Sequence, residues 1–308
     1  MNTILVTGGS GFIGSNVIGK LKQKFKIINL DINSSKNDGV EQIIGDIRDK
    51  QLVEQAVEKC DAIIHLAAQV SVPLSVELPQ KTLEINVQGT QNIIDAAEKF
   101  DVKRLIMASS AAVYGQVGDL PLKEKSAGQC LSPYAQSKWD NEVQIKLARE
   151  NGMEAVALRF FNVYGVGQST DGAYAAVVPK FIEMMTSGQN PTILGDGLQS
   201  RDFVHVQDVV RVIETLIECD WKVVQTHAYN VASQSKTSIL DLIDLINKMM
   251  KEKSPSFEII KPNFEPSRAG DIMHSYADIS EISKALDWSP SVELSQGLEE
   301  LVSNEIND

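Results

Sequence analysis

The first 31 residues hold the feature that most restricts the fold: an apolar run, three spaced glycines, a helical segment and a second apolar run ending in an acid. The segment Ile4–Thr7 predicts a buried parallel strand, and Gly8, Gly11 and Gly14 follow it with the spacing G-x-x-G-x-x-G. The first glycine permits a tight turn, the second lets a pyrophosphate approach the backbone, and the third lets the helix pack closely on the sheet. The spacing alone also suits a flexible loop, but the flanking strand and helix and the acid Asp31 favour a dinucleotide-binding turn.

Asp31 closes the second strand-like segment, Lys26–Leu30, and indicates which dinucleotide the turn binds. A carboxylate at this position can accept hydrogen bonds from the ribose hydroxyls of NAD, and it repels the additional phosphate of NADP. A solvated acid at a strand end is the alternative. Because Asp31 follows the glycine turn at the required point, we predict NAD as the cofactor.

Composition excludes several other classes of protein. The net charge of −12 makes the chain a poor electrostatic match for nucleic acid or an anionic membrane, so any phosphate must be bound locally. Cys60, Cys130 and Cys219 lack C-x-x-C spacing, which indicates neither a disulfide framework nor a zinc site. We find no signal peptide before the first strand and no apolar run near the roughly 18 residues that span a bilayer. These observations predict a cytoplasmic protein without a membrane segment or a metal.

Strand-like segments alternate with helical segments through the first half of the chain. This alternation predicts an α/β protein with a doubly wound parallel sheet of the Rossmann type. The strand-like segments are Ile4–Thr7, Lys26–Leu30, Gln42–Gly45, Ala62–Leu66, Arg104–Ser109 and Ala155–Phe161.

The regular pattern ends after Gly165, where turns containing Gly and Pro interrupt it. We predict an NAD-binding domain over residues 1–165, and we expect the chain to return to it around 203–231. The remaining parts, 166–202 and 232–308, are predicted to form a smaller C-terminal α/β lobe that binds the substrate.

Three side chains turn a cofactor-binding fold into a candidate enzyme. Ser110 follows the strand Arg104–Ser109, at the sheet edge where open α/β sheets bind ligands, and Tyr134 and Lys138 share one helix face. A neighbouring ammonium favours the phenolate and a cationic nicotinamide would add to that shift, so we expect the pKa of Tyr134 to fall from its reference value of about 10 toward working pH. Tyr134 would then transfer protons, with Ser110 on the same substrate oxygen and Lys138 on the nicotinamide ribose. A packed tyrosine and a solvated lysine explain the pair alone equally well, but the three signals together favour catalysis.

Together these motifs resemble the extended short-chain dehydrogenase/reductases, and most closely the UDP-glucose 4-epimerase family of nucleotide-sugar epimerases. The resemblance runs nearly end to end and includes Gly45–Asp49, His65–Gln69, Glu84–Val87 and Leu158–Gly165. The contacts with NAD that it implies are at Gly8, Gly11, Phe12, Ile13, Gly14, Asp31, Asp46, Ile47, Leu66, Ala67, Ala68, Gln69, Asn86, Ser109, Tyr134, Lys138 and Phe161.

The second half carries the resemblance to a nucleotide-sugar site. Arg201 and Arg268 resemble two arginines that clamp a nucleotide diphosphate, and Asp271 resembles an acid on the ribose. A structural salt bridge is the commoner role of one arginine, but two at matching positions in an acidic protein favour a diphosphate, which the planar guanidinium meets bidentately. The substrate contacts that the resemblance implies are at Ser110, Ala111, Tyr134, Asn162, Val177, Thr192, Leu194, Arg201, Arg268, Asp271 and Ser275. His65 and His205 lack spaced partners, and we interpret both as structural.

The resemblance implies a UDP-sugar 4-epimerase that oxidises and re-reduces the sugar C4 through NAD. Dehydratase and decarboxylase relatives carry acidic residues after the catalytic Ser/Thr, whereas Ala111 and Ala112 follow Ser110 here and cannot move a proton. A carbonyl reductase would share the first domain but would not need Arg201 and Arg268. A non-catalytic NAD-binding sensor is a further alternative, although such proteins often lose the tyrosine or lysine that this chain retains.

Two finer expectations concern the sugar and the assembly. Counting from Arg268 places Ser275 where glucose-restricted epimerases have a bulky tyrosine, so N-acetylated UDP-hexosamines should fit beside UDP-glucose and UDP-galactose. A one-residue loop difference would instead place Tyr276 there and restrict the enzyme to glucose and galactose. The resemblance also implies a homodimer through a four-helix interface built from the helices around 87–100 and 134–150. Their expected outer residues are Ile93, Ile94, Val143 and Leu147, although some of these must face the sheet instead.

Overall fold

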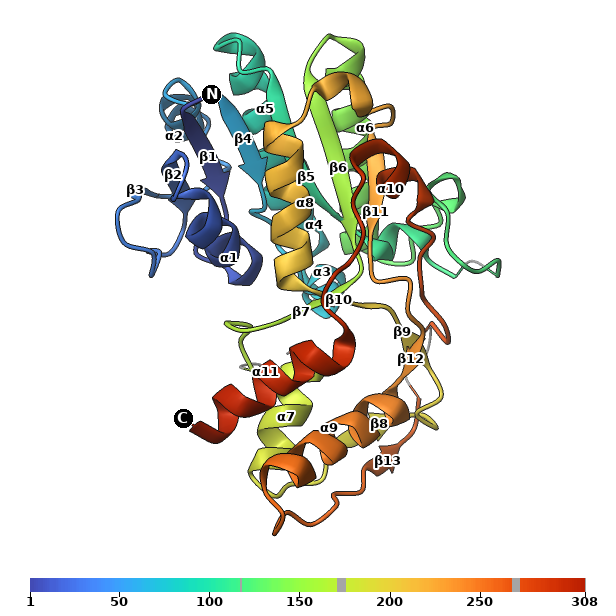
Figure 1. Ribbon diagram of the computed structural model, residues 1–308. Helices are drawn as coiled ribbons and strands as arrows, with labels where there is room; N and C mark the ends of the chain where they lie inside the picture. Colours follow the sequence, from blue (N-terminus) through green and yellow to red (C-terminus); the bar gives the residue numbers. More distant parts are fainter. Residues whose placement is uncertain (117, 171–175, 268–271, 308) are drawn as a thin grey trace.

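The computed structural model describes residues 1–116, 118–170, 176–267 and 272–307 (Figure 1). Within these residues seven strands form one sheet in the order β11-β6-β5-β4-β1-β2-β3, and every neighbouring pair is parallel. The strand order reverses between β1 and β4, which is the switch point where such sheets bind ligands. The predicted doubly wound α/β fold is confirmed. The strands are β1 (Thr3–Thr7), β2 (Lys26–Asp31), β3 (Glu41–Ile44), β4 (Ala62–His65), β5 (Arg104–Ser110), β6 (Glu154–Phe160) and β11 (Ala228–Val231).

Helices cover both faces of this sheet because its central strands are apolar on both sides. On β1, Ile4 and Val6 pack into one core while Leu5 packs into the other. The first core contains side chains of α1 (Phe12–Leu21) and α8 (Val206–Glu218), and α8 lies across the face of the sheet in Figure 1. The second core contains side chains of α2 (Lys50–Val57), α5 (Gly89–Lys99) and α6 (Pro133–Glu150).

The apolar side of α5 differs from the sequence-based expectation. Ile93 and Ile94 are buried in the core beneath the sheet, so they do not belong to an outer face. Val143 and Leu147 on α6 are 44% and 53% exposed, as the expected interface requires. Helix periodicity identified an apolar stripe in both segments, but only packing decides whether that stripe faces the sheet or solvent.

The connection from β4 to α5 contains α3 (Val72–Glu77), α4 (Pro79–Leu83) and one π-helical turn, Glu84–Gln88. A π turn inside a helical run often accompanies a functional site. Short 3₁₀ turns elsewhere in the described chain are Ala111–Tyr114, Glu124–Ser126 and Trp221–Val223.

A smaller lobe lies beyond the carboxyl ends of the strands (Figure 1). Its core joins α7 (Val177–Thr186), α9 (Ile239–Lys253) and α11 (Leu294–Asn307). Short strand pairs complete it: β8 (Thr192–Leu194) with β13 (Asn263–Glu265), and β9 (Ser200–Arg201) with β12 (Thr237–Ser238). Between the lobes, β7 (Asn162–Tyr164) pairs with β10 (Phe203–His205). The chain then re-enters the large sheet as β11, and α10 (Ser280–Leu286) contributes Ile282 to the core beside it.

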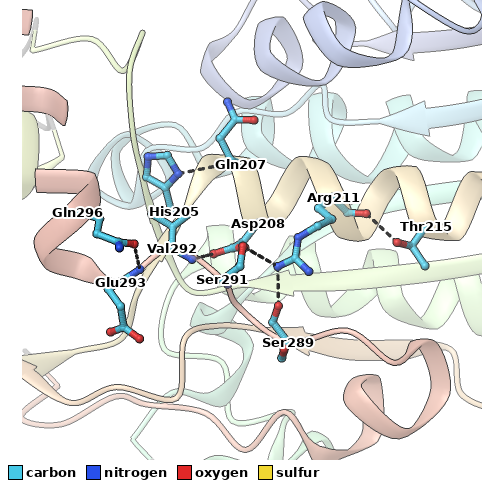
Figure 2. Close-up of polar contacts among 10 residues, drawn as sticks. All are labelled: His205, Gln207, Asp208, Arg211, Thr215, Ser289, Ser291, Val292, Glu293 and Gln296. Carbon is cyan, nitrogen blue, oxygen red and sulfur yellow. Dashed lines mark hydrogen bonds and ion pairs between the residues drawn. The ribbon is translucent and has the colours of Figure 1, made fainter.

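One buried acid fastens the segment that runs from α10 to α11 (Figure 2). Asp208, in the first turn of α8, accepts hydrogen bonds from the Ser291 amide at 2.9 Å, the Ser291 hydroxyl at 2.8 Å and the Val292 amide at 3.2 Å. Arg211 pairs with Asp208 and also donates to the Ser289 carbonyl. The first lobe therefore holds the segment that leads into α11, the last helix of the small lobe.

Candidate active site

The glycine turn has the backbone geometry that a dinucleotide requires. Gly8 has a φ of +71°, and a Cβ there would lie 2.6 Å from the Ala67 amide nitrogen. A Cβ on Gly14 would lie 2.2 Å from the Gly8 carbonyl oxygen, so both positions exclude larger residues. Gly11 caps α1 without a side-chain hydrogen bond, which leaves the first helical amides to an anion. This cradle fits the pyrophosphate of NAD, with Phe12 and Ile13 in the first helical turn.

Asp31 is oriented by the same turn. One carboxylate oxygen accepts from the Ser10 amide and the other accepts from the Asn33 amide, both at 2.9 Å. Each oxygen keeps a second lone pair that a ribose hydroxyl can use. The side chain of the buried Asn29 donates to the Ser10 hydroxyl at 3.0 Å and braces the turn from below. The geometry therefore places the acid directly against the glycine turn.

The segment after β3 carries the expected adenine contacts. Arg48 pairs with Asp46 at 2.6 Å, and this hydrogen bonding holds the pKa of the Asp46 carboxyl below its usual value. Ile47 is buried and lies against Gly89, at the start of α5. Asp46 thus remains charged with an arginine partner, while Ile47 contributes to the core.

Asn86 joins three elements at the centre of the sheet edge. Its side-chain oxygen accepts from the Gln69 amide at 2.7 Å, and its amide group donates to the Gln69 carbonyl at 3.0 Å and the Ser137 hydroxyl at 2.9 Å. Asn86 lies in the π-helical turn, which aims its side chain inward between the Leu66–Gln69 segment and α6. The structure thereby brings together three of the sequence motifs.

His65 has a structural role at this edge of the sheet. Its Nδ1 lies 2.6 Å from the Thr7 hydroxyl and its Nε2 lies 2.9 Å from the Thr90 hydroxyl. Because Thr90 donates to the Asn86 carbonyl, it accepts from Nε2, and the ring is the neutral Nε2–H tautomer. Burial lowers the pKa of His65 to about 3, and the positive charge of Lys138 acts in the same direction.

The three catalytic candidates lie at the ends of β5 and α6. Tyr134 and Lys138 are 9% and 5% exposed, and the Lys138 ammonium donates to the Ala108 carbonyl at 2.8 Å. The Ser110 hydroxyl accepts from the Ala112 amide at 3.2 Å and hydrogen-bonds the Tyr134 phenol. Serine and tyrosine therefore converge on one point, with the ammonium held on the neighbouring strand.

The pKa of Tyr134 moves in the opposite direction to the sequence-based expectation. Burial raises the pKa of its phenol, and only the hydrogen bond from Ser110 acts to lower it. Burial lowers the pKa of Lys138 to about 8, while the negative charge of Glu142 raises it. The lower pKa expected beside a cationic nicotinamide stays a prediction, because helix spacing predicts proximity, whereas desolvation depends on the surrounding packing.

Sequence reasoning missed two charged residues directly behind this centre. Glu142 and Arg159 are 1% and 2% exposed and form an ion pair of 2.7 Å. Glu142 follows Lys138 by four residues, and Arg159 interrupts an apolar strand. Both facts were available signals, because a charged residue in a buried strand needs a partner.

The small lobe presents the expected substrate residues on short elements. Arg201 donates to the Ser200 carbonyl at 2.9 Å and the Ile272 carbonyl at 2.7 Å. The Ser275 amide donates to the Ser200 carbonyl at 3.1 Å, so the segment with the expected gate runs beside β9. Val177 begins α7, and Thr192 and Leu194 lie on β8. Arg268 and Asp271 lie outside the described residues.

The buried Asp202 fixes this gate segment. It accepts from the Ser233 amide and hydroxyl, both at 2.7 Å, and from the Ala277 amide at 3.1 Å. Asn162 donates to the Asp202 carbonyl at 3.2 Å, and the Leu122 amide donates to the Tyr276 carbonyl at 2.9 Å. The segment beyond residue 272 is therefore bonded to both lobes.

Two general properties restrict the chemistry further. Across the described residues, no group of three or more His, Cys, Asp or Glu side chains is arranged to hold a metal ion. In the same residues, no helix combines the length and apolar character needed to cross a membrane.

Known proteins resemble this chain in both sequence and architecture. A profile of the NAD dependent epimerase/dehydratase family matches residues 4–232. A putative UDP-glucose 4-epimerase of Methanocaldococcus jannaschii is 37% identical over 309 residues, covering 97% of each chain. The solved UDP-N-acetylglucosamine 4-epimerase of Methanobrevibacter ruminantium superposes with a TM-score of 0.92 at 33% identity, covering 99% of this chain and 98% of that one.

Other relatives extend the range of reactions. The UDP-glucose 4-epimerase of Thermotoga maritima has a TM-score of 0.89 at 32% identity and covers 98% of this chain and 97% of its own. Relatives named as a dTDP-D-glucose 4,6-dehydratase and a UDP-N-acetyl-alpha-D-glucosaminuronate decarboxylase also match along the chain. With its glycine cradle, its acid at the end of β2 and its Ser–Tyr–Lys centre, the chain belongs to the NAD-dependent epimerase/dehydratase family of extended short-chain dehydrogenase/reductases, whose cofactor is NAD.

Proposed function

We propose that the protein is a UDP-sugar 4-epimerase. The observation that carries the proposal is the convergence of Ser110 and Tyr134 at a strand end that continues into Ala111 and Ala112. The centre can transfer a proton to and from one hydroxyl, but the two alanines supply no acid beside it for an elimination. A dehydratase or decarboxylase would need such a group. A reductase or an NAD-binding sensor would leave Arg201 without a function in substrate binding.

The residues divide the reaction between the lobes. Tyr134 accepts the proton of the sugar 4-hydroxyl and later returns it, while Ser110 holds the same oxygen and Lys138 provides positive charge. NAD, when bound, supplies the acceptance and return of the C4 hydride. Arg201 lies on β9 of the small lobe, where it would hold the diphosphate while the 4-keto sugar turns over.

The proposed substrates are UDP-glucose and UDP-galactose together with their N-acetylated counterparts. Ser275 is 8% exposed and small, so it leaves room at the gate that a tyrosine would fill. The structural relative named as a UDP-N-acetylglucosamine 4-epimerase supports this extension.

The proposed assembly is a cytoplasmic homodimer through α5 and α6. Val143 and Leu147 are exposed four residues apart on α6, and an apolar stripe of this kind can pack against its copy. Light scattering at micromolar concentration should give twice the monomer mass. The double variant Val143→Glu/Leu147→Glu should give one monomer mass, and a monomeric parent would contradict the proposal.

Proton NMR of the holoenzyme tests the activity. We would incubate it separately with UDP-glucose, UDP-N-acetylglucosamine and UDP-glucuronate and follow the anomeric signals. A 4-epimerase converts its substrate into the C4 epimer with no net change in NAD. Appearance of a 4-keto-6-deoxy sugar or of a pentose would instead identify a dehydratase or a decarboxylase.

A further inference from the structure

Glu142 occupies the space directly behind the reaction centre. Its Oε1 accepts from the Ser109 hydroxyl at 2.5 Å and from the Arg159 Nε at 2.9 Å, and its Oε2 accepts from the Arg159 Nη2 at 2.7 Å. Ser109 immediately precedes Ser110, and Lys138 lies one helical turn before Glu142. One carboxylate thus touches the strand end that carries the serine and faces the lysine along α6.

Arg159 cannot swing away from this position. Its remaining Nη1 donates to the Tyr114 hydroxyl at 2.9 Å and the Glu124 carbonyl at 2.8 Å, and its guanidinium lies 5.1 Å from the centre of the Tyr114 ring. The Tyr114 hydroxyl in turn donates to Asn230 at 2.6 Å. Each member is hydrogen-bonded on several sides, which fixes the orientation of the Glu142 carboxylate.

A second acid–arginine pair joins β5 to β6 without such burial, whereas Glu142 reaches Arg159 of β6 from α6. Arg104 and Glu154 face each other at the first residues of β5 and β6, at the end of these strands that is remote from the catalytic residues. They pair at 2.7 Å, with 12% and 36% of their side chains exposed. Ser109 and Arg159 face each other in the same register at the catalytic end. A fully buried ion pair commonly adds little net stability compared with apolar side chains. The position of the Glu142–Arg159 ion pair at the catalytic end therefore indicates a role in the reaction.

We propose that Glu142 is a positioning residue of the Ser110–Tyr134–Lys138 centre, holding the end of β5 through Ser109 and placing its negative charge one helical turn from Lys138, with Arg159 locking its carboxylate. This inference rests on the proposed function for its effect on turnover. Its electrostatic part does not depend on which sugar is used.

The charged groups around Lys138 support this role. On α6 the lysine faces Tyr134 and Glu142; from β4 it faces His65, which is neutral; and from β5 it faces the Ala108 carbonyl. Arg159 on β6 is held by Glu142. Glu142 is thus the one negative charge, among the described residues, that raises the pKa of Lys138 against burial. Without it Lys138 loses its proton at lower pH, because burial then acts on its ammonium with no opposing charge.

The test compares Glu142→Gln with Glu154→Gln in the NAD holoenzyme. The titration of Lys138 is followed by NMR of ¹⁵N-labelled lysine side chains, with the Lys138→Met holoenzyme used to assign its signal. We expect Glu142→Gln to lower the midpoint by about one pH unit, the effect of a lost nearby charge, and to move the alkaline fall in turnover to lower pH. Glu142→Asp, which retains the charge, and Glu154→Gln should keep the parent midpoint. An unchanged midpoint in Glu142→Gln, or an equal shift in Glu154→Gln, overturns the proposal.

Ser109→Ala keeps the test open if Glu142→Gln does not fold. This variant leaves the ion pair in place and removes only the hydroxyl that links it to the strand. We expect kcat to fall roughly tenfold at unchanged KM, as for a lost orienting contact, and unaltered kcat would overturn the positioning role. If the parent epimerises no nucleotide sugar, the proposed function fails, while the titration of Lys138 still decides the electrostatic part.

Discussion

The two lobes hold their functional residues in different ways. In the first lobe, Tyr134 and Lys138 are buried at the carboxyl edge of the parallel sheet, which has seven strands in the described part of the chain. The long parallel strands of this sheet fix the surroundings of both side chains. In the small lobe, Arg201 lies on the two-residue strand β9, and Ser275 lies in a segment that backbone hydrogen bonds hold beside that strand. The difference suggests that chemistry is fixed in the first lobe, while selectivity can change in the second without disturbing it.

Tyr134→Phe gives the largest expected effect and tests the first lobe. Removing the proton-transfer group should lower turnover by about 10²–10⁴-fold, because nothing else at the centre replaces it. NAD binding, measured by calorimetry, should persist. Tyr229→Phe is the matched control, since Tyr229 lies on the edge strand β11 and its hydroxyl accepts from the Gln225 amide at 3.1 Å. Turnover near the parent level in Tyr134→Phe would place the chemistry elsewhere.

Ser275→Tyr tests whether selectivity belongs to the small lobe. A bulky gate should lower the ratio of UDP-N-acetylgalactosamine to UDP-galactose turnover by about 10–200-fold, the range for one steric contact in a pocket. Ser275→Ala should leave the ratio as it is. A parent that rejects the acetylated sugar, or a tyrosine variant with an unaltered ratio, would show that the gate lies at another residue.

The variant Asp202→Asn tests how much the hydrogen bonds of Asp202 to the gate segment stabilise the fold. The amide cannot accept from the Ser233 and Ala277 groups as the carboxylate does, so we expect a loss of about 1–3 kcal/mol in the free energy of unfolding. Urea denaturation measures this loss. Asp196→Asn, on an exposed turn of the same lobe, should cost less than about 0.5 kcal/mol. Equal costs would mean that Asp202 is not a structural anchor.

His65 gives the smallest effect near neutral pH, where it is visible only as a pH dependence of stability. Its folded pKa of about 3 lies below the ordinary value of 6.5, so the unfolded chain takes up a proton that the folded chain does not. Stability should therefore fall as pH drops below 6.5, by at most about 1.4 kcal/mol per unit from this group. His65→Gln should flatten the slope in urea titrations, with His274→Gln as the control for a lost imidazole. An identical slope in the parent and in His65→Gln would show that His65 does not contribute to the pH dependence of stability.

The sequence predicted the first lobe well because its constraints are local. Gly8 and Gly14 cannot be replaced without a backbone clash, and the apolar strands alternate with helices in a pattern that few other folds share. The spacing of Tyr134 and Lys138 likewise follows from one helical turn. Which of Ile93, Ile94, Val143 and Leu147 face the sheet could not be predicted, because periodicity gives an apolar stripe without its direction.

The sequence by itself determined the family, the fold and the candidate catalytic trio, since each depends on short spacings that the backbone converts directly into geometry. The tertiary structure alone decided that the pKa of Tyr134 rises, that Glu142 and Arg159 stand behind the centre, and that the gate segment is bonded to both lobes. Desolvation and charge pairing depend on residues brought together from distant parts of the chain, and no local pattern records how deeply a group is buried.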